Sequence, residues 1–253
     1  MESQVTSPPD QVKPMSLLDR LTNVFASPGE LFENVRLTGK TTSSWLVPLV
    51  IMVVVSLILS QMVINNASLL GQMETMIKKT FEKNVQQGKM TQEQADQTYE
   101  NFARPGSGMA TAFRIGATVL GIPIVFLLVT LVYWLLGKWG MKATAPYMKV
   151  GEVVGLVFFI SILEAIVTTL MMFLMDSIYA SPSLALAVSG FDIENKLHIA
   201  LSKVNIFTIW SLIVTSIGLS KLFQRDLPKV LVLVFALWIL WSAFGILTGI
   251  RFG

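Results

Sequence analysis

Hydrophobic residues are gathered in five long stretches of this chain, and polar residues fill the segments between them. Four of these stretches contain no Asp, Glu, Lys or Arg, and the fifth contains a single Glu. Because a helix rises about 1.5 Å per residue, roughly 20 residues cross a hydrocarbon core of about 30 Å. Open sheet edges cannot face lipid, which favours helices over strands. The pattern predicts an all-α, polytopic membrane protein with five transmembrane helices, near residues 44–65, 113–137, 153–175, 203–222 and 229–249.

Composition supports this fold class and narrows the chemistry. Apolar residues make up 53% of the 253 residues and charged residues 14%, whereas a soluble domain usually has about 25% charged residues. The chain has no Cys, which excludes disulfides, thiolate metal sites and Cys nucleophiles. The net charge of +3 is spread over the loops, so we expect no nucleic-acid role.

The distribution of Lys and Arg predicts the orientation in the membrane. The second and fourth loops together carry six Lys or Arg residues, against two in the third loop. Short loops rich in Lys and Arg stay in the cytoplasm. We therefore expect a cytoplasmic N-terminus and a C-terminus across the membrane.

The segments outside the membrane have helical patterns of their own. We expect residues 1–14 to be a disordered tail and residues 15–40 to form amphipathic cytoplasmic helices, with Ser27, Pro28 and Glu30 starting the second one. The membrane domain would then span residues 41–253. In its first loop, two helix-forming segments separated by Gly88 and a Thr91 capping box predict a helical hairpin on the non-cytoplasmic side.

Glu164 lies near the middle of the third predicted span and is the strongest candidate for an intramembrane polar site. A charged residue at the centre of a membrane helix costs roughly 2.5–3.5 kcal/mol, so the carboxyl group should face the bundle and meet a hydroxyl group. Ser161 and Thr168 share its helix face, and the fourth span offers Ser211 and Thr215. Two interpretations are open: a structural hydrogen bond between helices, which we favour, or a proton- or substrate-handling site.

Small residues mark candidate helix-packing surfaces. Gly151 and Gly155 are four residues apart at the start of the third span, and Gly245 and Gly249 repeat this spacing near the C-terminus. Such pairs let helices approach closely, within one chain or between chains. We expect packing within the chain.

Motifs for catalysis are not found in the sequence. It contains no GxxxxGK[ST], no HExxH and no GxSxG in a strand–turn–helix setting. We therefore expect no enzymatic activity, no cofactor and no metal. The partners we expect are the lipid bilayer, and either further copies of the chain or other membrane proteins.

Three segments resemble the Yip family of membrane proteins, in its bacterial form with a Yip1 domain. They are "LLDRLTNVFASPGELFENVR", "MTQEQADQ" in the first loop, and "NIFTIWSLIVTSIGLSKLF". The last contains Ile209-Trp210 and Ile217-Gly218-Leu219 before a short basic loop. The resemblance covers about residues 15–250.

The resemblance implies five spans and a cytoplasmic N-terminus. Eukaryotic relatives act in vesicle trafficking and bind small GTPases, but this sequence lacks their Asp-Leu-Tyr-Gly-Pro motif. Bacterial members resemble inner-membrane proteins without an assigned reaction, so the resemblance implies the bacterial inner (cytoplasmic) membrane as the location. The function that we expect is a non-enzymatic scaffold, assembly or membrane-organising role through helix–helix contacts. The alternative is a small transporter or channel component that uses Glu164 in a polar path.

Overall fold

A computed structural model describes residues 12–248 of the chain. Most of the predicted tail, Gly249 of the second glycine pair and the last residue of the fifth span therefore lie outside the described residues. The described part is helical, with one isolated β-bridge between Ser183 and Asn205. Its α-helices are α1 (Leu17–Ala26), α2 (Pro28–Leu37), α3 (Ser43–Asn65), α4 (Ala67–Gln86), α5 (Gln92–Thr98), α6 (Gly108–Leu135), α7 (Tyr147–Leu174), α8 (Lys196–Lys203), α9 (Ile206–Phe223) and α10 (Leu227–Thr248).

Three shorter helical segments extend or connect these helices. A π-helical turn, η1 (Tyr99–Ala103), follows α5, and a second one, η2 (Leu136–Gly140), prolongs α6. A 3₁₀ turn, η3 (Leu184–Ala187), lies in the third loop.

The five predicted transmembrane helices are confirmed as helices long and apolar enough to cross a bilayer: α3, α6 with η2, α7, α9 and α10. The third one begins earlier than predicted, at Tyr147 rather than near residue 153. As a result Lys149 and Glu152, which the sequence pattern had placed outside the span, belong to the helix. Their side chains therefore need partners inside the protein.

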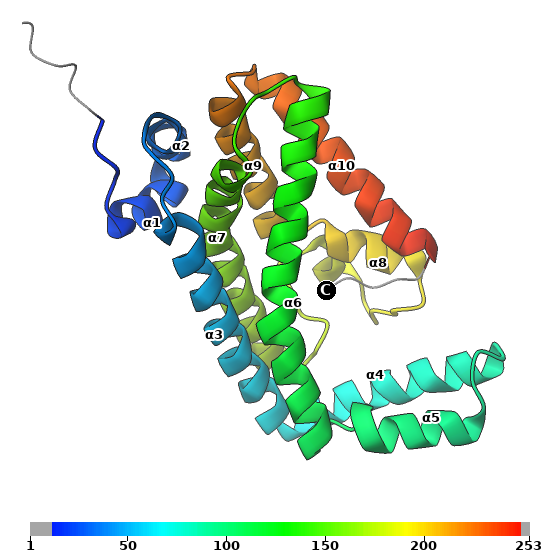
Figure 1. Ribbon diagram of the computed structural model, residues 1–253. Helices are drawn as coiled ribbons and strands as arrows, with labels where there is room; N and C mark the ends of the chain where they lie inside the picture. Colours follow the sequence, from blue (N-terminus) through cyan, green and yellow to red (C-terminus); the bar gives the residue numbers. More distant parts are fainter. Residues whose placement is uncertain (1–11, 249–253) are drawn as a thin grey trace, which may run out of the picture.

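Helix α7 is the centre of the bundle, packed against α3, α6 and α9 (Figure 1). Half of its most hydrophobic stretch is buried, against 11% in α3, α6 and α10. Glycines bring neighbouring helices close to it: a Cβ at Gly155 would overlap the backbone of Trp45 on α3, and a Cβ at Gly218 on α9 would overlap the side chain of Val153. Trp45 also stacks on Phe126 of α6, with ring centroids 5.5 Å apart.

The two ends of the bundle are different (Figure 1). At one end, α1 and α2 pack against α7 and α9, beside the connections at residues 141–146 and 224–226; we name this the platform end. At the other end α4 and α5 form a hairpin that projects sideways; we name this the hairpin end. The predicted hairpin is thus present, with Gly88 at a φ of 69° after α4 and the Thr91 capping box at the start of α5.

Helix α9 covers only the platform half of α7. Asn205, which precedes α9, lies beside Glu164, and Gly218 near the other end of α9 lies beside Val153. Beyond Glu164, α7 continues without α9 to Leu174, whose side chain is 84% exposed. In Figure 1, α10 likewise ends at the level of α8, so α3, α6 and α7 reach the hairpin end without α9 and α10.

The junction between α1 and α2 corrects one sequence prediction. Ser27 precedes Pro28 as expected, but its side chain makes no capping hydrogen bond, and the predicted box with Glu30 does not form. Ser27 also ends α1, because its N–H donates to the Asn23 carbonyl. The residue therefore belongs to the ends of both helices, and its backbone lies at φ −144°, ψ 61°. The capping box forms instead at Ser16 and Asp19, at the start of α1.

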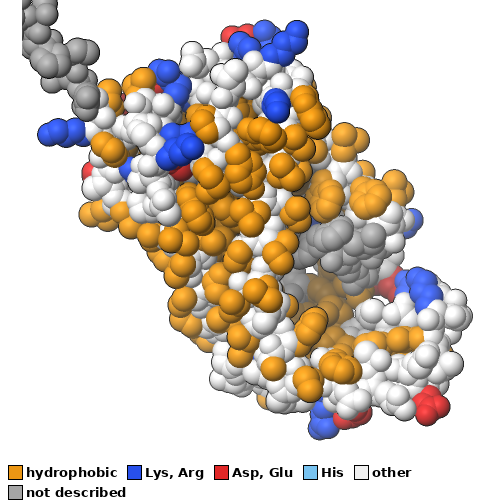
Figure 2. Space-filling model, in the orientation of Figure 1, with side chains coloured by type: hydrophobic (Ala, Val, Ile, Leu, Met, Phe, Trp, Pro, Cys, Tyr) orange, Lys and Arg blue, Asp and Glu red, His pale blue; other side chains and the backbone are white. Residues whose placement is uncertain are grey.

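The outer surface is strongly apolar. Figure 2 shows hydrophobic side chains covering α3 and α6 along most of their length, with Lys and Arg gathered mainly toward the ends of the molecule. Leu120 and Leu128 on α6 are 64% and 54% exposed. A surface of this kind is stable in contact with acyl chains or with other apolar helices.

Candidate functional site

Helix α7 carries the two polar sites that the bundle buries. One lies in its first turns, at Lys149 and Glu152, and the other lies near its middle, at Glu164. All other positions between Val150 and Val167 are apolar, Gly or Ser. The geometry of each site shows what its charges do.

Lys149 and Glu152 form a buried ion pair. Their side chains are 8% and 2% exposed, and Lys149 Nζ lies 3.2 Å from Glu152 Oε1. The lysine amine also donates to the carbonyl oxygens of Val35 (2.7 Å) and Gly39 (2.8 Å), while Glu152 Oε1 accepts from the Thr41 N–H (3.0 Å). Both side chains therefore hold the backbone between α2 and α3 against α7.

Arg20 on α1 adds a second buried cation to this cluster. It is 3% exposed, and its Nη1 donates to Ser44 Oγ at 2.5 Å. Burial lowers the pKa of Arg20 below its ordinary value, and the negative charge of Glu152 acts in the opposite direction. The Arg20 Nε has no hydrogen-bond partner among the described residues. We name Arg20, Ser44, Lys149 and Glu152 the buried ionic cluster.

A signal for this cluster is present in the sequence, although the prediction of the spans does not use it. Lys149 and Glu152 are opposite charges three residues apart, and such residues are neighbours on a helix. Lys149 had been counted among the loop residues that orient the chain. Because Lys149 is buried, the second and fourth loops contain five exposed Lys or Arg residues, against two Lys residues in the third loop.

Glu164 meets an amide rather than a hydroxyl. The Asn205 Nδ2 donates to Glu164 Oε1 at 2.7 Å, while the Oδ1 of the same amide accepts from the Phe207 N–H at 2.9 Å. Asn205 thus caps the start of α9 and ties it to α7. A carboxylate beside the N-terminal end of a helix is also favoured by the helix dipole.

The expected hydroxyl partners lie elsewhere. Among the described hydrogen bonds, none joins Glu164 to Ser161, Thr168, Ser211 or Thr215. Thr215 is 5% exposed, and the buried Ser211 Oγ has no partner in the described part of the chain. The reason is the level at which α9 begins. The residue beside the Glu164 carboxyl group is Asn205, which precedes α9, and not a hydroxyl residue within the helix.

The glycine pairs occupy different environments. Gly155 lies directly against Trp45, whereas a Cβ at Gly151 would be 3.4 Å from the Phe126 ring, an ordinary contact. Both glycines are thus in helix contacts within the chain. Gly245 is partly exposed on α10, and its predicted partner Gly249 lies outside the described residues.

Two pockets open at the platform end, away from both polar sites of α7. The larger, of about 710 Å³, lies between η2 and the start of α10 and is lined by Lys142, Arg225 and Lys229 among others. The smaller, of about 530 Å³, lies between α2 and the end of α9. Neither is lined by Glu164 or Lys149. Within residues 12–248, no three His, Asp or Glu side chains gather in a way that could hold a metal ion.

The family model of the Yip1 domain matches residues 22–249. The chain belongs to the Yip1 domain family. The match begins inside α1 and ends just after α10, so the Yip1 domain includes all five membrane helices, Glu164 and the Lys149–Glu152 pair. No curated protein and no solved structure matches the chain. The family and the five apolar helices together identify an integral membrane protein.

Proposed function

We propose that this Yip1 domain protein is a non-enzymatic scaffold or assembly protein of the bacterial inner membrane, which acts through helix–helix contacts. Its platform end faces the cytoplasm and its hairpin end faces the opposite side. The partners are lipid and other membrane helices, those of a second copy included.

One observation carries this proposal: the charges buried in the bundle are used to hold the chain together. The lysine amine of the Lys149–Glu152 pair contacts one carbonyl in the last turn of α2 and one in the α2–α3 connection, and the carboxylate accepts from Thr41. Such contacts occupy the polar atoms that a substrate would need. They also fix α1 and α2 on the bundle as a rigid platform.

The exposed helices supply the surface for assembly. In α3, α6 and α10 only 11% of the hydrophobic stretch is buried, and large residues such as Leu120 and Leu128 are 64% and 54% exposed. Without a hydrophobic driving force between helices in lipid, association depends on packing and on specific contacts. Scaffold partners are therefore expected to contact these faces.

Site-specific photo-crosslinking in native membranes tests the proposal. A crosslinker at position 120 or 128 should give discrete protein adducts, including a band at twice the monomer mass if the partner is a second copy. Phe126 on the same helix is 1% exposed and serves as the matched control, since a crosslinker there should react within the chain. Exclusive labelling of lipid from exposed positions on α3, α6 and α10 would exclude the scaffold role.

A transporter or channel component is the alternative function, and the position of Glu164 favours it. This carboxyl group is only partly buried and lies near the middle of α7. Intramembrane carboxyl groups of this kind often belong to ion or proton paths.

Two variants of Glu164 distinguish the functions. Glu164→Gln keeps a hydrogen-bonding oxygen for Asn205, whereas Glu164→Leu does not. A structural role predicts that the Gln variant keeps nearly the thermostability of the native protein in detergent, while the Leu variant loses about 1 kcal/mol. A Gln variant that is fully stable but abolishes a proton-coupled flux in liposomes would establish transport instead.

A further inference from the structure

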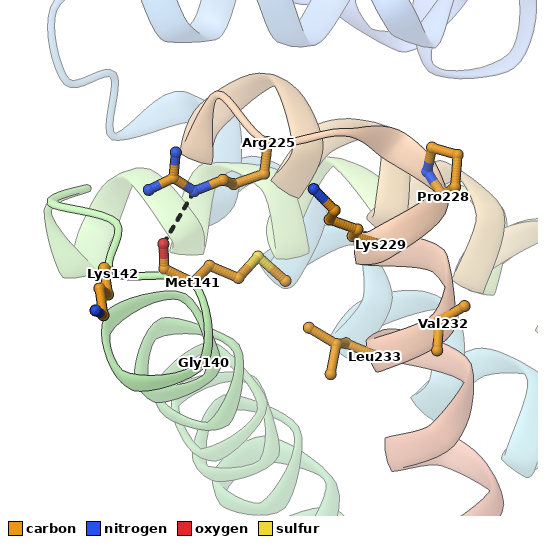
Figure 3. Close-up of a pocket in the computed structure, with 8 residues that line it drawn as sticks. All are labelled: Gly140, Met141, Lys142, Arg225, Pro228, Lys229, Val232 and Leu233. Atoms are coloured by element: carbon orange, nitrogen blue, oxygen red, sulfur yellow. Dashed lines mark hydrogen bonds between the residues drawn. The ribbon is translucent and has the colours of Figure 1, made fainter.

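The larger pocket at the platform end combines three cations with an apolar wall. Lys142 follows η2, whereas Arg225 and Lys229 flank the start of α10. Figure 3 shows Arg225 reaching over Met141, and Lys229 placed between Arg225 and the apolar side chains of Val232 and Leu233. The pocket volume of about 710 Å³ is within the range of small-molecule sites.

A contact with the backbone fixes the position of Arg225. The Arg225 Nε donates to the Met141 carbonyl oxygen at 2.9 Å, which joins the α9–α10 connection to the α6–α7 connection. Among the described residues, no hydrogen bond uses the two Nη groups of Arg225. A guanidinium held in this way presents its remaining donors to an anion, and phosphate is the anion that it binds best in a two-point geometry.

The charges facing the pocket have one acidic neighbour. Asp226 accepts from Lys229 Nζ at 2.7 Å, in a pair whose side chains are 71% and 75% exposed. The lysine lowers the pKa of Asp226 below its ordinary value. Such an exposed pair is weak and is readily exchanged for another anion. Lys142, Arg225 and Lys229 carry three positive charges against this single negative one.

The apolar wall leads directly to the lipid. Val232 on α10 is 67% exposed and lies one turn below Lys229, on a helix that crosses the membrane. The pocket therefore has cations at the membrane surface and aliphatic side chains at the depth of the acyl chains. A free phosphate would use the cations alone, whereas a phospholipid would use both.

We propose that this pocket binds the phosphate headgroup of an anionic phospholipid, with an acyl chain along Val232 and Leu233. Basic pockets between membrane helices are known sites for acidic headgroups. The site goes beyond the scaffold role and does not depend on it.

Native mass spectrometry of the full-length protein in detergent tests the site, with phosphatidylglycerol and phosphatidylcholine as probes. The variant Lys142→Gln/Lys229→Gln should bind phosphatidylglycerol about tenfold or more weakly, because charge-assisted hydrogen bonds are lost. Phosphatidylcholine binding should not change. The matched control is Lys13→Gln/Lys40→Gln, which removes the same charge from exposed lysines near the platform end.

Each outcome decides the proposal. Preferential retention of phosphatidylglycerol by the native protein and the control, but not by the pocket variant, supports it. Equal weakening in the control would mean diffuse surface attraction and would overturn it. Displacement of the lipid by an equal concentration of inorganic phosphate or glycerol phosphate would assign the pocket to a soluble anion, and no preference for phosphatidylglycerol would refute a site altogether.

Discussion

Removing one partner of the Lys149–Glu152 pair should destabilise the protein strongly. The variant Lys149→Met leaves the Glu152 carboxylate, at 2% exposure, without its ion-pair partner, and it deprives the Val35 and Gly39 carbonyls of a donor. Breaking a buried ion pair on one side costs about 3–5 kcal/mol. At about 2–4 °C per kcal/mol for a chain of this size, the midpoint of thermal unfolding should fall by roughly 6–20 °C.

A double-mutant cycle separates the pair from its surroundings. Lys149→Met/Glu152→Met removes both charges, and apolar replacements of a buried pair are often nearly neutral. The double variant should therefore be more stable than the sum of the single variants predicts, by about 2 kcal/mol or more. Thermal unfolding in detergent, followed by tryptophan fluorescence, measures all four proteins under the same conditions.

An exposed lysine near the same end of the bundle serves as the control. Lys40→Met removes an exposed lysine near the same end of the bundle and should change stability by less than about 0.5 kcal/mol. Hydrogen exchange should increase in the segment from α2 to the start of α3 in Lys149→Met, but not in Lys40→Met. If Lys149→Met unfolds within about 2 °C of the native protein, the pair does not hold the platform on the bundle.

Three further predictions address packing, topology and pH. Gly155→Ala should lower the stability measured by thermal unfolding by about 1–3 kcal/mol, because the added methyl group would overlap the Trp45 backbone. The control Gly116→Ala, with nothing within 4 Å of the added methyl group, should be neutral. Equal effects of the two substitutions would contradict the close approach of α3 to α7 at Gly155. In this Cys-free chain, a Cys at position 89 should react with an impermeant maleimide from outside and a Cys at 142 should not, and the opposite result would invert the topology. Arg36 lowers the pKa of Glu33. The carboxylate therefore stabilises the fold at pH values above its ordinary pKa, and this contribution is lost as the pH falls through the lower pKa of the folded state. In thermal scans, Glu33→Gln should be less stable than the native protein by about 0.3–0.5 kcal/mol near about pH 7 and equal to it at about pH 3.

The sequence predicted the membrane helices because their signal is local. A stretch of roughly 20 residues without charge is recognised from composition alone, and the caps at Gly88 and Thr91 depend on neighbours within one turn. The same reasoning failed where charge lies inside a membrane helix. Lys149 was interpreted as a loop residue because its partners, the Val35 and Gly39 carbonyls, are more than 100 residues away in the chain.

The partner of Glu164 shows the same limit. Helical spacing put hydroxyl groups on one face of the fourth span, but it carried no information about where that span begins relative to α7. The third loop brings Asn205 to the level of Glu164, and this depends on contacts such as the Ile206 N–H with the Pro182 carbonyl at 3.1 Å. The family match shows the shared architecture but does not identify either partner.

The level at which α9 begins makes the last turns of α7 the part of that helix that lipid contacts most directly. Ile166, Leu170 and Leu174 recur every four residues beyond Glu164 and are 37%, 54% and 84% exposed, so they form one apolar stripe that becomes more exposed toward the hairpin end. The helix that holds the platform at one end therefore contacts acyl chains at the other, and the thickness and composition of the bilayer act directly on its last turns.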